Sequence, residues 1–293
     1  MVALTDGKDS SFSVDNTNTP PRKLKILMLH GYTQSGKLLH AKTRGIEKLL
    51  HRYFPAEINA HNGSFPGYPG GVQLIYPTGP FRLTTTNIPG FSAKRLDADE
   101  ENELWGWWTR DMDSDLFAGL EQGLASIARV IRENGGIDAI MGFSQGAAAA
   151  AFVASLLEPG REQAFADVRK KNPSAMHFPE DWRDLSTLCP NGLKFAVIFS
   201  GFLPMHPSYR AFFKPRIQAP TLHIIGTLDS VIDEFRSIAL AERCVSKGKK
   251  LVYHQGGHIV PNSRLIKGVL TSFIRDCLIG RSSEKGVEKL RLP

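Results

Sequence analysis

Short apolar runs alternate along the chain with segments in which apolar residues recur every three or four positions. The short runs have the length of buried β-strands, and the recurring spacing is typical of helices that pack one face against a core. Strand-length runs occupy residues 24–29, 72–76, 138–141, 195–199, 222–225 and 251–253. Helical spacing occupies residues 37–53, 113–133, 145–157, 208–213, 232–245 and 263–278. Because strands alternate with helices, we predict an α/β fold with a mostly parallel, doubly wound sheet and helices on both faces.

Polar and irregular segments set the limits of this domain. Residues 1–22 are polar and predict a disordered arm, and residues 280–293 predict a polar C-terminal tail. A single domain over residues 23–279 accounts for the pattern between them, since no internal repeat divides it. Within this domain, residues 81–110 and 158–192 are irregular or rich in charge and proline. Such long stretches are usually functional loops, so we interpret both as lid-like segments.

The pentapeptide Gly142-Phe143-Ser144-Gln145-Gly146 stands between a predicted strand and a predicted helix. A G-x-S-x-G sequence in this context is typical of a nucleophile elbow, a sharp turn that holds the serine in a strained conformation at the carboxyl edge of the sheet. The flanking glycines avoid collisions where strand and helix approach each other. We therefore predict Ser144 as a nucleophile. A serine in an ordinary tight turn is the alternative, and the partner residues must decide between the two.

A serine hydroxyl becomes a good nucleophile only when a base removes its proton and a third group orients that base. In folds with this elbow, the acid and then the histidine follow the serine along the chain. Asp229 comes directly after the predicted strand 222–225, at the edge where Ser144 is expected. Asp233 begins a predicted helix, where a capping or solvated role is the expectation. We therefore predict that Asp229 orients the base.

His258 follows Gly256-Gly257 in the loop after the last predicted strand, from which its side chain can reach the nucleophile. We predict it as the general base. The other histidines downstream of Ser144 are worse placed: His177 is in the irregular segment, His206 is in a loop, and His223 and His254 are inside strand runs where a packed histidine is expected.

When a serine attacks a carbonyl group, the carbonyl oxygen becomes an oxyanion that two backbone N–H groups stabilise. In folds of this kind one N–H belongs to the residue after the nucleophile, here Gln145, and the second comes from the loop after an early strand. That loop is residues 30–36 here. We predict the N–H of Tyr32, with that of Thr33 as the alternative. His30, which opens the loop, is expected to be structural.

Several motifs together resemble the FSH family of serine hydrolases, a eukaryotic and largely fungal family. The resemblance covers residues 23–277 and rests on LHGYTQSG (29–36), YPTGP (76–80), Trp107-Trp108, GFSQGA (142–147), FSGF (199–202), GTLDSVI (226–232) and HQGGHIVP (254–261). The GFSQG string by itself also resembles carboxylesterases and acyl-protein thioesterases. The tryptophan pair, YPTGP and GGHIVP favour the FSH family.

This resemblance implies an α/β-hydrolase fold and a cytoplasmic esterase or thioesterase that acts on acyl chains. Some fungal relatives are similar to off-loading thioesterases that release polyketides from a synthase. Acyl transfer to an acceptor other than water, and a non-catalytic binding protein on a hydrolase fold, stay open as alternatives. Trp107 and Trp108 are candidates for lining an acyl pocket, although aromatic residues in packed loops are mostly part of a core.

Composition narrows the partners further. The formal net charge of +7 comes from 36 basic and 29 acidic residues without a basic block on one face. It therefore gives little support to nucleic-acid binding, but it fits steering of an acidic acyl-carrier domain. The 3 cysteines lack a CxxC pair, and the acidic run 97–103 has no histidine or cysteine nearby. We thus expect neither a disulfide framework nor a metal site, and no dinucleotide or phosphate-loop motif predicts a cofactor.

Overall fold

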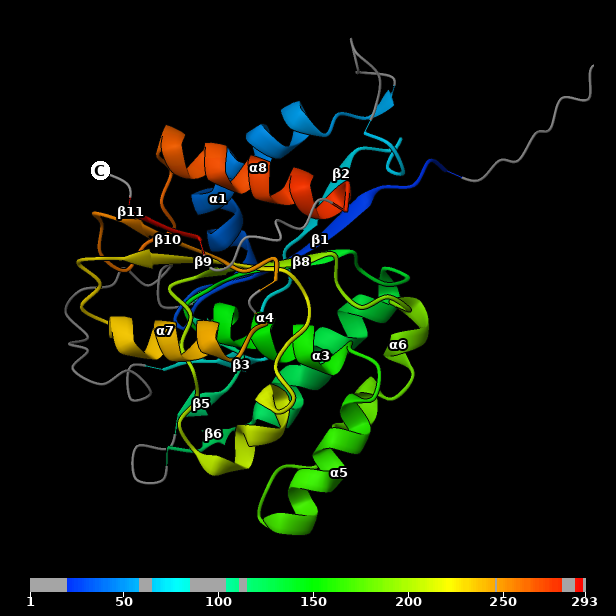
Figure 1. Cartoon of the computed structure of the whole chain (residues 1–293), viewed down its shortest axis with the longest axis vertical. Coiled ribbons are helices and arrows are strands. Elements are labelled where there is room, and N and C mark those ends of the chain that lie inside the picture. Colours follow the sequence, from blue (N-terminus) through cyan, green and yellow to red (C-terminus); the bar gives the residue numbers. More distant parts are fainter. Residues whose placement is uncertain are drawn as a thin grey trace, which may run out of the picture.

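The computed structural model describes residues 20–57, 65–84, 104–110, 115–245, 247–280 and 288–291 (Figure 1). Within these residues, one sheet contains 7 strands in the order β11-β10-β9-β8-β7-β1-β2. Every neighbouring pair is parallel. The strands are β1 (Leu24–Leu29), β2 (Val72–Ile75), β7 (Ala139–Phe143), β8 (Phe195–Phe199), β9 (Thr221–Gly226), β10 (Lys250–His254) and β11 (Glu288–Arg291). The predicted α/β fold with a doubly wound parallel sheet is confirmed.

The strand order reverses between β1 and β7. The chain first adds β2 on one side of β1 and then builds β7 to β11 successively on the other side. At such a switch point, the loops that follow the two central strands diverge and leave a crevice at the carboxyl edge of the sheet. Here these are the loop that begins at His30 and the turn at Ser144, so the topology brings them to the same place.

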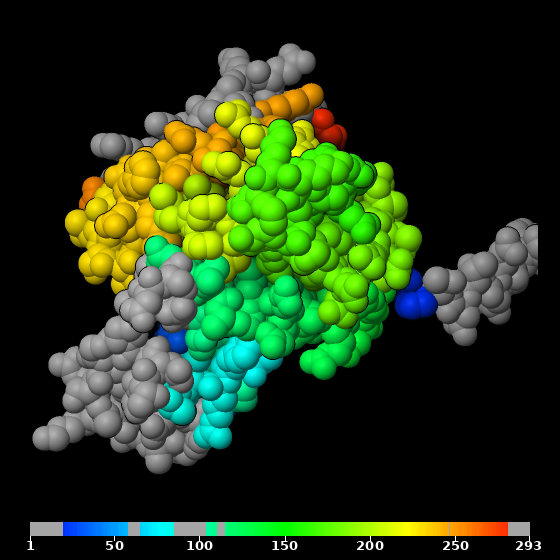
Figure 2. All heavy atoms as spheres, turned by 90° about the horizontal axis from the view of Figure 1, so that it is seen from below, coloured from blue at the N-terminus to red at the C-terminus, as the bar shows by residue number. Residues whose placement is uncertain are grey.

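Helices cover both faces of the sheet (Figure 1). On one face lie α1 (Gly36–Tyr53) and α8 (Arg264–Leu278), which contact each other. On the other face lie α3 (Leu120–Glu133), α4 (Gln145–Leu156) and α7 (Glu234–Glu242). In Figure 2, which views the molecule from below, α3 lies near the centre of this second face and α7 at its left edge. None of the helices in the described part of the chain combines the length and the apolar character that crossing a bilayer requires.

Helix α4 has no exposed side. All of its residues are buried, and alanine occupies every position from Ala147 to Ala151. Small side chains allow its axis to approach the sheet closely, and it contacts β7, β8 and β1. Ser144 directly precedes this helix, so the residue predicted as the nucleophile is joined to an element that is packed on every side.

Short elements that the sequence pattern does not predict occur before α3. Two antiparallel strand pairs connect β3 (Phe81–Arg82) with β4 (Trp105–Gly106) and β5 (Thr109–Arg110) with β6 (Phe117–Ala118), all within the described residues. Helix α3 begins at Leu120, later than the predicted residue 113, because β6 and the left-handed Gly119 (φ 82°) precede it. Strand β11 is also unexpected, since a polar tail was predicted there.

The segment 158–192 forms α5 (Arg161–Lys171), η4 (Glu180–Trp182) and α6 (Leu185–Leu188). Helix α5 packs against η5 (Pro207–Phe213), while η4 and α6 pack against α3. Just after α6, the Cys189 thiol donates to the carbonyl of Ile137 at the amino-terminal end of β7 (3.4 Å). These contacts hold the segment against η5, α3 and the start of β7. The role of this segment as a lid stays a prediction, as does that of residues 81–110.

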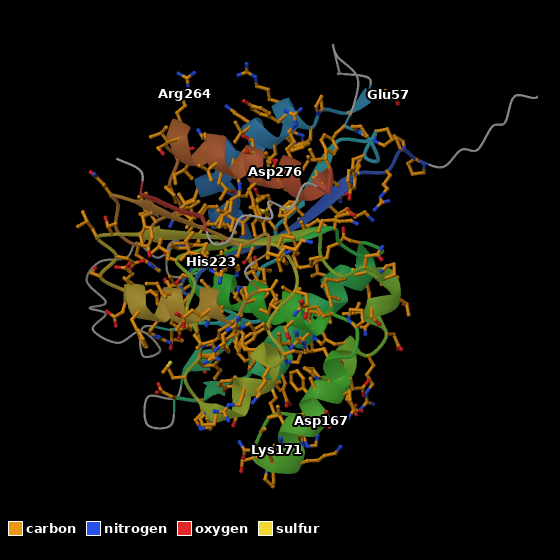
Figure 3. All side chains as sticks on the ribbon, in the orientation of Figure 1. Glu57, Asp167, Lys171, His223, Arg264 and Asp276 are labelled. Carbon is orange, nitrogen blue, oxygen red and sulfur yellow. The ribbon has the colours of Figure 1, made fainter. Side chains whose placement is uncertain are left out.

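His223 lies in the middle of β9, within the layer of the sheet (Figure 3). Its side chain is buried, and neither ring nitrogen has a hydrogen-bond partner among the described residues. Burial, with a smaller contribution from the charge of Lys249, lowers the pKa of His223 to about 3. The folded protein therefore keeps this imidazole neutral at pH values where the unfolded chain protonates it.

Acid should destabilise the protein through His223. Below pH 6.5 the unfolded chain takes up a proton that the native state refuses, so stability is lost as the pH falls from about 6.5 towards about 3. The contribution of this residue should amount to about 2 kcal/mol between pH 7 and pH 5. Urea unfolding of wild type and His223→Leu at both pH values measures it. The variant should lose about 2 kcal/mol less on acidification, and equal losses would contradict this account.

Candidate active site

The carboxyl ends of three strands bring the predicted site residues together. Ser144 follows β7, Asp229 lies in the loop after β9, and His258 lies in the loop after β10. Parallel strands all end at the same edge of a sheet, so residues far apart in the sequence meet there. The structure thus places all three predicted residues at the edge that the sequence pattern indicates.

Two hydrogen bonds of equal length connect the three side chains. The Oγ of Ser144 lies 2.8 Å from Nε2 of His258. The Nδ1 of the same ring lies 2.8 Å from Oδ2 of Asp229. An ionised carboxylate can only accept, so Nδ1 carries the proton, and the lone pair of Nε2 accepts the hydrogen bond from the Ser144 hydroxyl. The three side chains therefore have the hydrogen-bonding order that a nucleophile, a base and an orienting acid require.

The backbone at Ser144 has the strain expected of a nucleophile elbow. Its φ of 54° and ψ of −116° lie outside the usual regions for a residue with a side chain. A Cβ on Gly142 would lie 2.1 Å from the carbonyl oxygen of Gly146, and a Cβ on Gly146 would lie 2.2 Å from that of Leu29. Glycine is thus required at both flanking positions by close backbone approach, as the G-x-S-x-G pattern predicts.

The carboxylate of Asp229 is held by its own loop as well as by His258. Its Oδ1 accepts hydrogen bonds from the amides of Val231 and Ile232, both at 2.9 Å. Burial raises the pKa of this carboxyl, but the two amides and the imidazole outweigh that effect and leave the pKa below its ordinary value. Asp229 is therefore ionised at neutral pH. The alternative acid, Asp233, is exposed and immediately precedes α7.

The loops that carry Asp229 and His258 are joined by backbone hydrogen bonds. The amide of Thr227 donates to the carbonyl of His254 (2.9 Å), and that of Leu228 donates to the carbonyl of Gly256 (3.1 Å). The ring of His254 closes the turn, because its Nδ1 accepts from the amide of Gly256 at 3.1 Å. His254 is thus a packed, hydrogen-bonded residue, as expected for a histidine in a strand.

The early loop predicted to complete an oxyanion hole lies against the elbow. A Cβ on Gly31 would be 3.3 Å from the Cβ of Ser144. The imidazole of His30 donates from Nδ1 to the carbonyl of Gly31 (2.8 Å) and accepts at Nε2 from the amide of Gly79 (2.9 Å). Burial lowers the pKa of His30 to about 4, so the ring is neutral. Tyr32 follows Gly31 directly and is the residue whose amide we predicted as a donor.

The predicted pocket residues Trp107 and Trp108 are almost entirely buried, at 1% and 2% exposure. The ring of Trp108 stacks on Phe117 with centroids 5.0 Å apart, and the indole N–H of Trp107 donates to the carbonyl of His30 (2.9 Å). These contacts give both residues a packing role next to the site. Direct contact with a substrate stays a prediction for each of them.

Sequence reasoning missed what the side chain of Gln145 does. Its Oε1 accepts from the amide of Trp107, and its Nε2 donates to the carbonyl of Trp108, both at 2.8 Å. The pairing crosses almost forty positions of sequence, so no local signal announces it. The hydrogen bonds from the amides of Val231 and Ile232 to Asp229 could have been predicted from the sequence, because aspartate in turns commonly accepts from amides two and three residues later.

Large apolar side chains stand exposed beside the acid and the base. They are Leu228 (70% exposed), Val231 (63%) and Ile259 (52%), and we call them the apolar rim. The loops of Leu228 and Ile259 adjoin, since the amide of Leu228 binds the carbonyl of Gly256 and Ile259 packs near that glycine. Exposed apolar groups that gather at one place commonly mark a binding surface.

Metal ligands were not expected in this chain. Among the residues that the structure describes, no group of three or more histidine, cysteine or acidic side chains is arranged to hold a metal ion. The acidic run 97–103 lies outside those residues.

Comparison with known families and proteins adds independent information. The profile of a family described as Serine hydrolase (FSH1) matches residues 19–269. The Saccharomyces cerevisiae protein Family of serine hydrolases 3 is 30% identical over 278 residues, which cover 91% of this chain and 87% of that protein. Human Esterase OVCA2 is 27% identical over 253 residues, covering 82% of this chain and 90% of its own.

One relative is much longer than this chain. A Schizosaccharomyces pombe protein named Dihydrofolate reductase is 28% identical over 258 residues, 86% of this chain, but the match spans only 47% of that protein. Its name therefore describes a protein about twice the length of the matched region. Among solved structures, Zea mays acyl-protein thioesterase 2 superposes with a TM-score of 0.52 at 18% identity, covering 87% of this chain and 95% of that one. This similarity shows the α/β-hydrolase fold.

Proposed function

Since the chain belongs to the FSH family of serine hydrolases, we propose that Ser144, His258 and Asp229 form its catalytic triad. In this proposal the triad cleaves carboxylic esters or thioesters through an acyl-enzyme on Ser144. The observation that carries it is the unbroken pair of 2.8 Å hydrogen bonds from Ser144 through His258 to Asp229.

The reaction proceeds in two halves. The Nε2 of His258 takes the proton from Oγ of Ser144 as that oxygen attacks the carbonyl carbon, and the carbonyl becomes a tetrahedral oxyanion. Its collapse breaks the bond to the leaving alcohol or thiol, which receives the proton from His258. Water then repeats the sequence on the acyl-enzyme and releases the carboxylic acid. Asp229 stays ionised throughout and stabilises the imidazolium.

The backbone amides of Tyr32 and Gln145 are the proposed oxyanion donors. Gln145 is the first residue of α4, and the positive end of a helix dipole favours negative charge at that point. The loop of Tyr32 is adjacent, because Gly31 packs against Ser144. Each such donor typically contributes about 3 to 4 kcal/mol to transition-state stabilisation.

The apolar rim supports a substrate with an acyl chain, such as a fatty-acyl or polyketide ester or thioester. Leu228 and Val231 flank Asp229, and Ile259 follows His258, so an acyl group bonded to Ser144 has apolar surface close to its carbonyl. Burying one methylene contributes about 0.8 kcal/mol, or roughly fourfold in affinity. The formal charge of +7 supports delivery of such a chain by an acidic carrier domain.

A panel of nitrophenyl esters and thioesters of graded chain length tests this proposal. We expect kcat/KM to rise from the acetyl substrate by up to about fourfold per methylene, with the free acid as product. A carrier-bound acyl thioester should also lose rate as salt is added, whereas a small thioester should not.

The joint substitution Leu228→Ser and Ile259→Ser should flatten the dependence on chain length. Tyr53→Ser is the matched control, because Tyr53 is also exposed (56%) but lies far from the site. It is the last residue of the 18-residue helix α1, whose first residue, Gly36, belongs to the early loop. Binding of acyl ligands without turnover, or transfer of the acyl group in place of hydrolysis, would contradict the proposed reaction.

A further inference from the structure

Trp107 connects two segments that carry the proposed oxyanion donors. We propose that it is a positioning residue that fixes the distance between the amide of Tyr32 and the amide of Gln145. This inference rests on the proposed function, because it concerns how the same site holds its shape. It also gives a role to a residue that the sequence pattern indicated as a pocket candidate.

The contacts of Trp107 reach both segments at once. Its backbone N–H donates to Oε1 of Gln145 (2.8 Å), whose own amide is one proposed donor. Its indole N–H donates to the carbonyl of His30 (2.9 Å), two residues before the other proposed donor. The rings of Trp107 and His30 also pack with centroids 4.9 Å apart. One side chain and its peptide therefore bridge the loop after β1 and the start of α4.

Gln145 strengthens this bridge by binding two successive residues. While Oε1 accepts from Trp107, Nε2 donates to the carbonyl of Trp108 (2.8 Å). An amide side chain that pairs in this way has little rotational freedom left, and its backbone is fixed in turn. All three residues are buried, so water is a poor substitute for any lost partner.

Two glycines pack closely against the backbone of Trp107 and leave it little room to move. A Cβ on Gly123 of α3 would lie 2.0 Å from the carbonyl oxygen of Trp107, and a Cβ on Gly79 would lie 3.2 Å from its nitrogen. The amide of Gly79 in turn donates to Nε2 of His30 (2.9 Å). Trp107, His30 and Gly79 thus contact one another in a closed network, and Gln145 connects this network to the turn at Ser144.

A donor that stabilises an oxyanion must point at the position of that oxygen in the transition state. A displacement of about 1 Å at a catalytic group can cost about 100-fold in rate. Loosening the bridge should therefore lower transition-state stabilisation while leaving the binding of the ground-state acyl chain nearly unchanged. A residue that supported only the fold would not produce this separation.

Trp107→Phe tests the idea, and Trp182→Phe is its matched control. Trp182 is equally buried, at 1% exposure, but its indole nitrogen has no hydrogen-bond partner among the described residues. Both substitutions remove the same atoms from a buried site, and only the first removes a hydrogen bond. We expect Trp107→Phe to lower kcat about 10- to 100-fold, with KM within about twofold of wild type. Trp182→Phe should leave both constants within about threefold.

The affinity of a trifluoromethyl ketone, which forms a tetrahedral adduct, supplies the second readout. It should fall with kcat in Trp107→Phe and stay unchanged in Trp182→Phe. If Trp107→Phe does not fold, Gln145→Met, which loses both bonds to the tryptophan pair, should show the same separation of kcat from KM. Equal effects of the folded Trp107→Phe and Trp182→Phe variants, or a change confined to KM, would overturn the role of Trp107. Activity retained by Ser144→Ala would instead overturn the proposed function itself.

Discussion

Replacing Ser144 by alanine is expected to reduce kcat about 10⁶-fold and to abolish covalent labelling by a fluorophosphonate probe. The reason is that the proposed acyl-enzyme forms on Ser144, whose Oγ is hydrogen-bonded to the imidazole of His258. Labelling followed by mass spectrometry should locate the probe on the peptide that contains Ser144. Measuring hydrolysis of an activated ester on the same samples relates the loss of labelling to the loss of turnover.

Ser200→Ala is a demanding control for this experiment. Ser200 follows β8 just as Ser144 follows β7, it is buried, and its φ of 47° is strained in the same sense. Its amide donates to the carbonyl of Ile224, as that of Ser144 donates to Phe199, both at 2.9 Å. The difference is that the Ser200 hydroxyl has no hydrogen-bond partner among the described residues. Ser200→Ala should therefore keep full labelling. Equal labelling of wild type and Ser144→Ala would rule out Ser144 as the nucleophile.

Asp229→Asn should lower kcat about 10⁴-fold without a comparable loss of stability. An asparagine amide that donates to Nδ1 of His258 would move the imidazole proton to Nε2, and Nε2 would then no longer accept the proton of Ser144. The amides of Val231 and Ile232 would keep an oxygen acceptor, so the loop should retain its shape. Steady-state kinetics and thermal unfolding of the same preparation separate the two effects.

Asp233→Asn makes the same chemical change four positions later. Asp233 is exposed, precedes α7 and makes no side-chain capping hydrogen bond. Its replacement should leave kcat within about threefold of wild type. A large loss in Asp233→Asn together with a small one in Asp229→Asn would reverse the assignment of the acid.

The features that the sequence could predict are those with a short-range signal. The central parallel strands β1, β7, β8, β9 and β10 appear as apolar runs because they are buried on both faces, and the crossover helices follow from their spacing. Ser144, Asp229 and His258 could be selected because each follows such a run, and turn chemistry at a strand end is visible in a few residues. The structure brings these three together at one edge, as the chain order predicts.

The features that could not be predicted depend on contacts between distant segments. The pairing of Gln145 with the tryptophan pair leaves no periodicity, and the short strands around Trp105 and Phe117 are too brief to have a pattern. Strand β11 consists largely of polar residues and joins the sheet through its backbone, which hydrophobicity does not reveal. Tertiary context decides such cases, because local preference is weak in short elements.

The all-buried helix α4 has a consequence for directed evolution of this protein. Enlarging any alanine between Ala147 and Ala151 would overpack the buried surroundings of the helix and cost about 1 to 3 kcal/mol, enough to remove many variants before their activity is sampled. The exposed rim positions Leu228, Val231 and Ile259 carry no such penalty. Libraries that diversify the rim and leave α4 untouched should therefore yield a higher proportion of folded enzymes with altered chain-length preference.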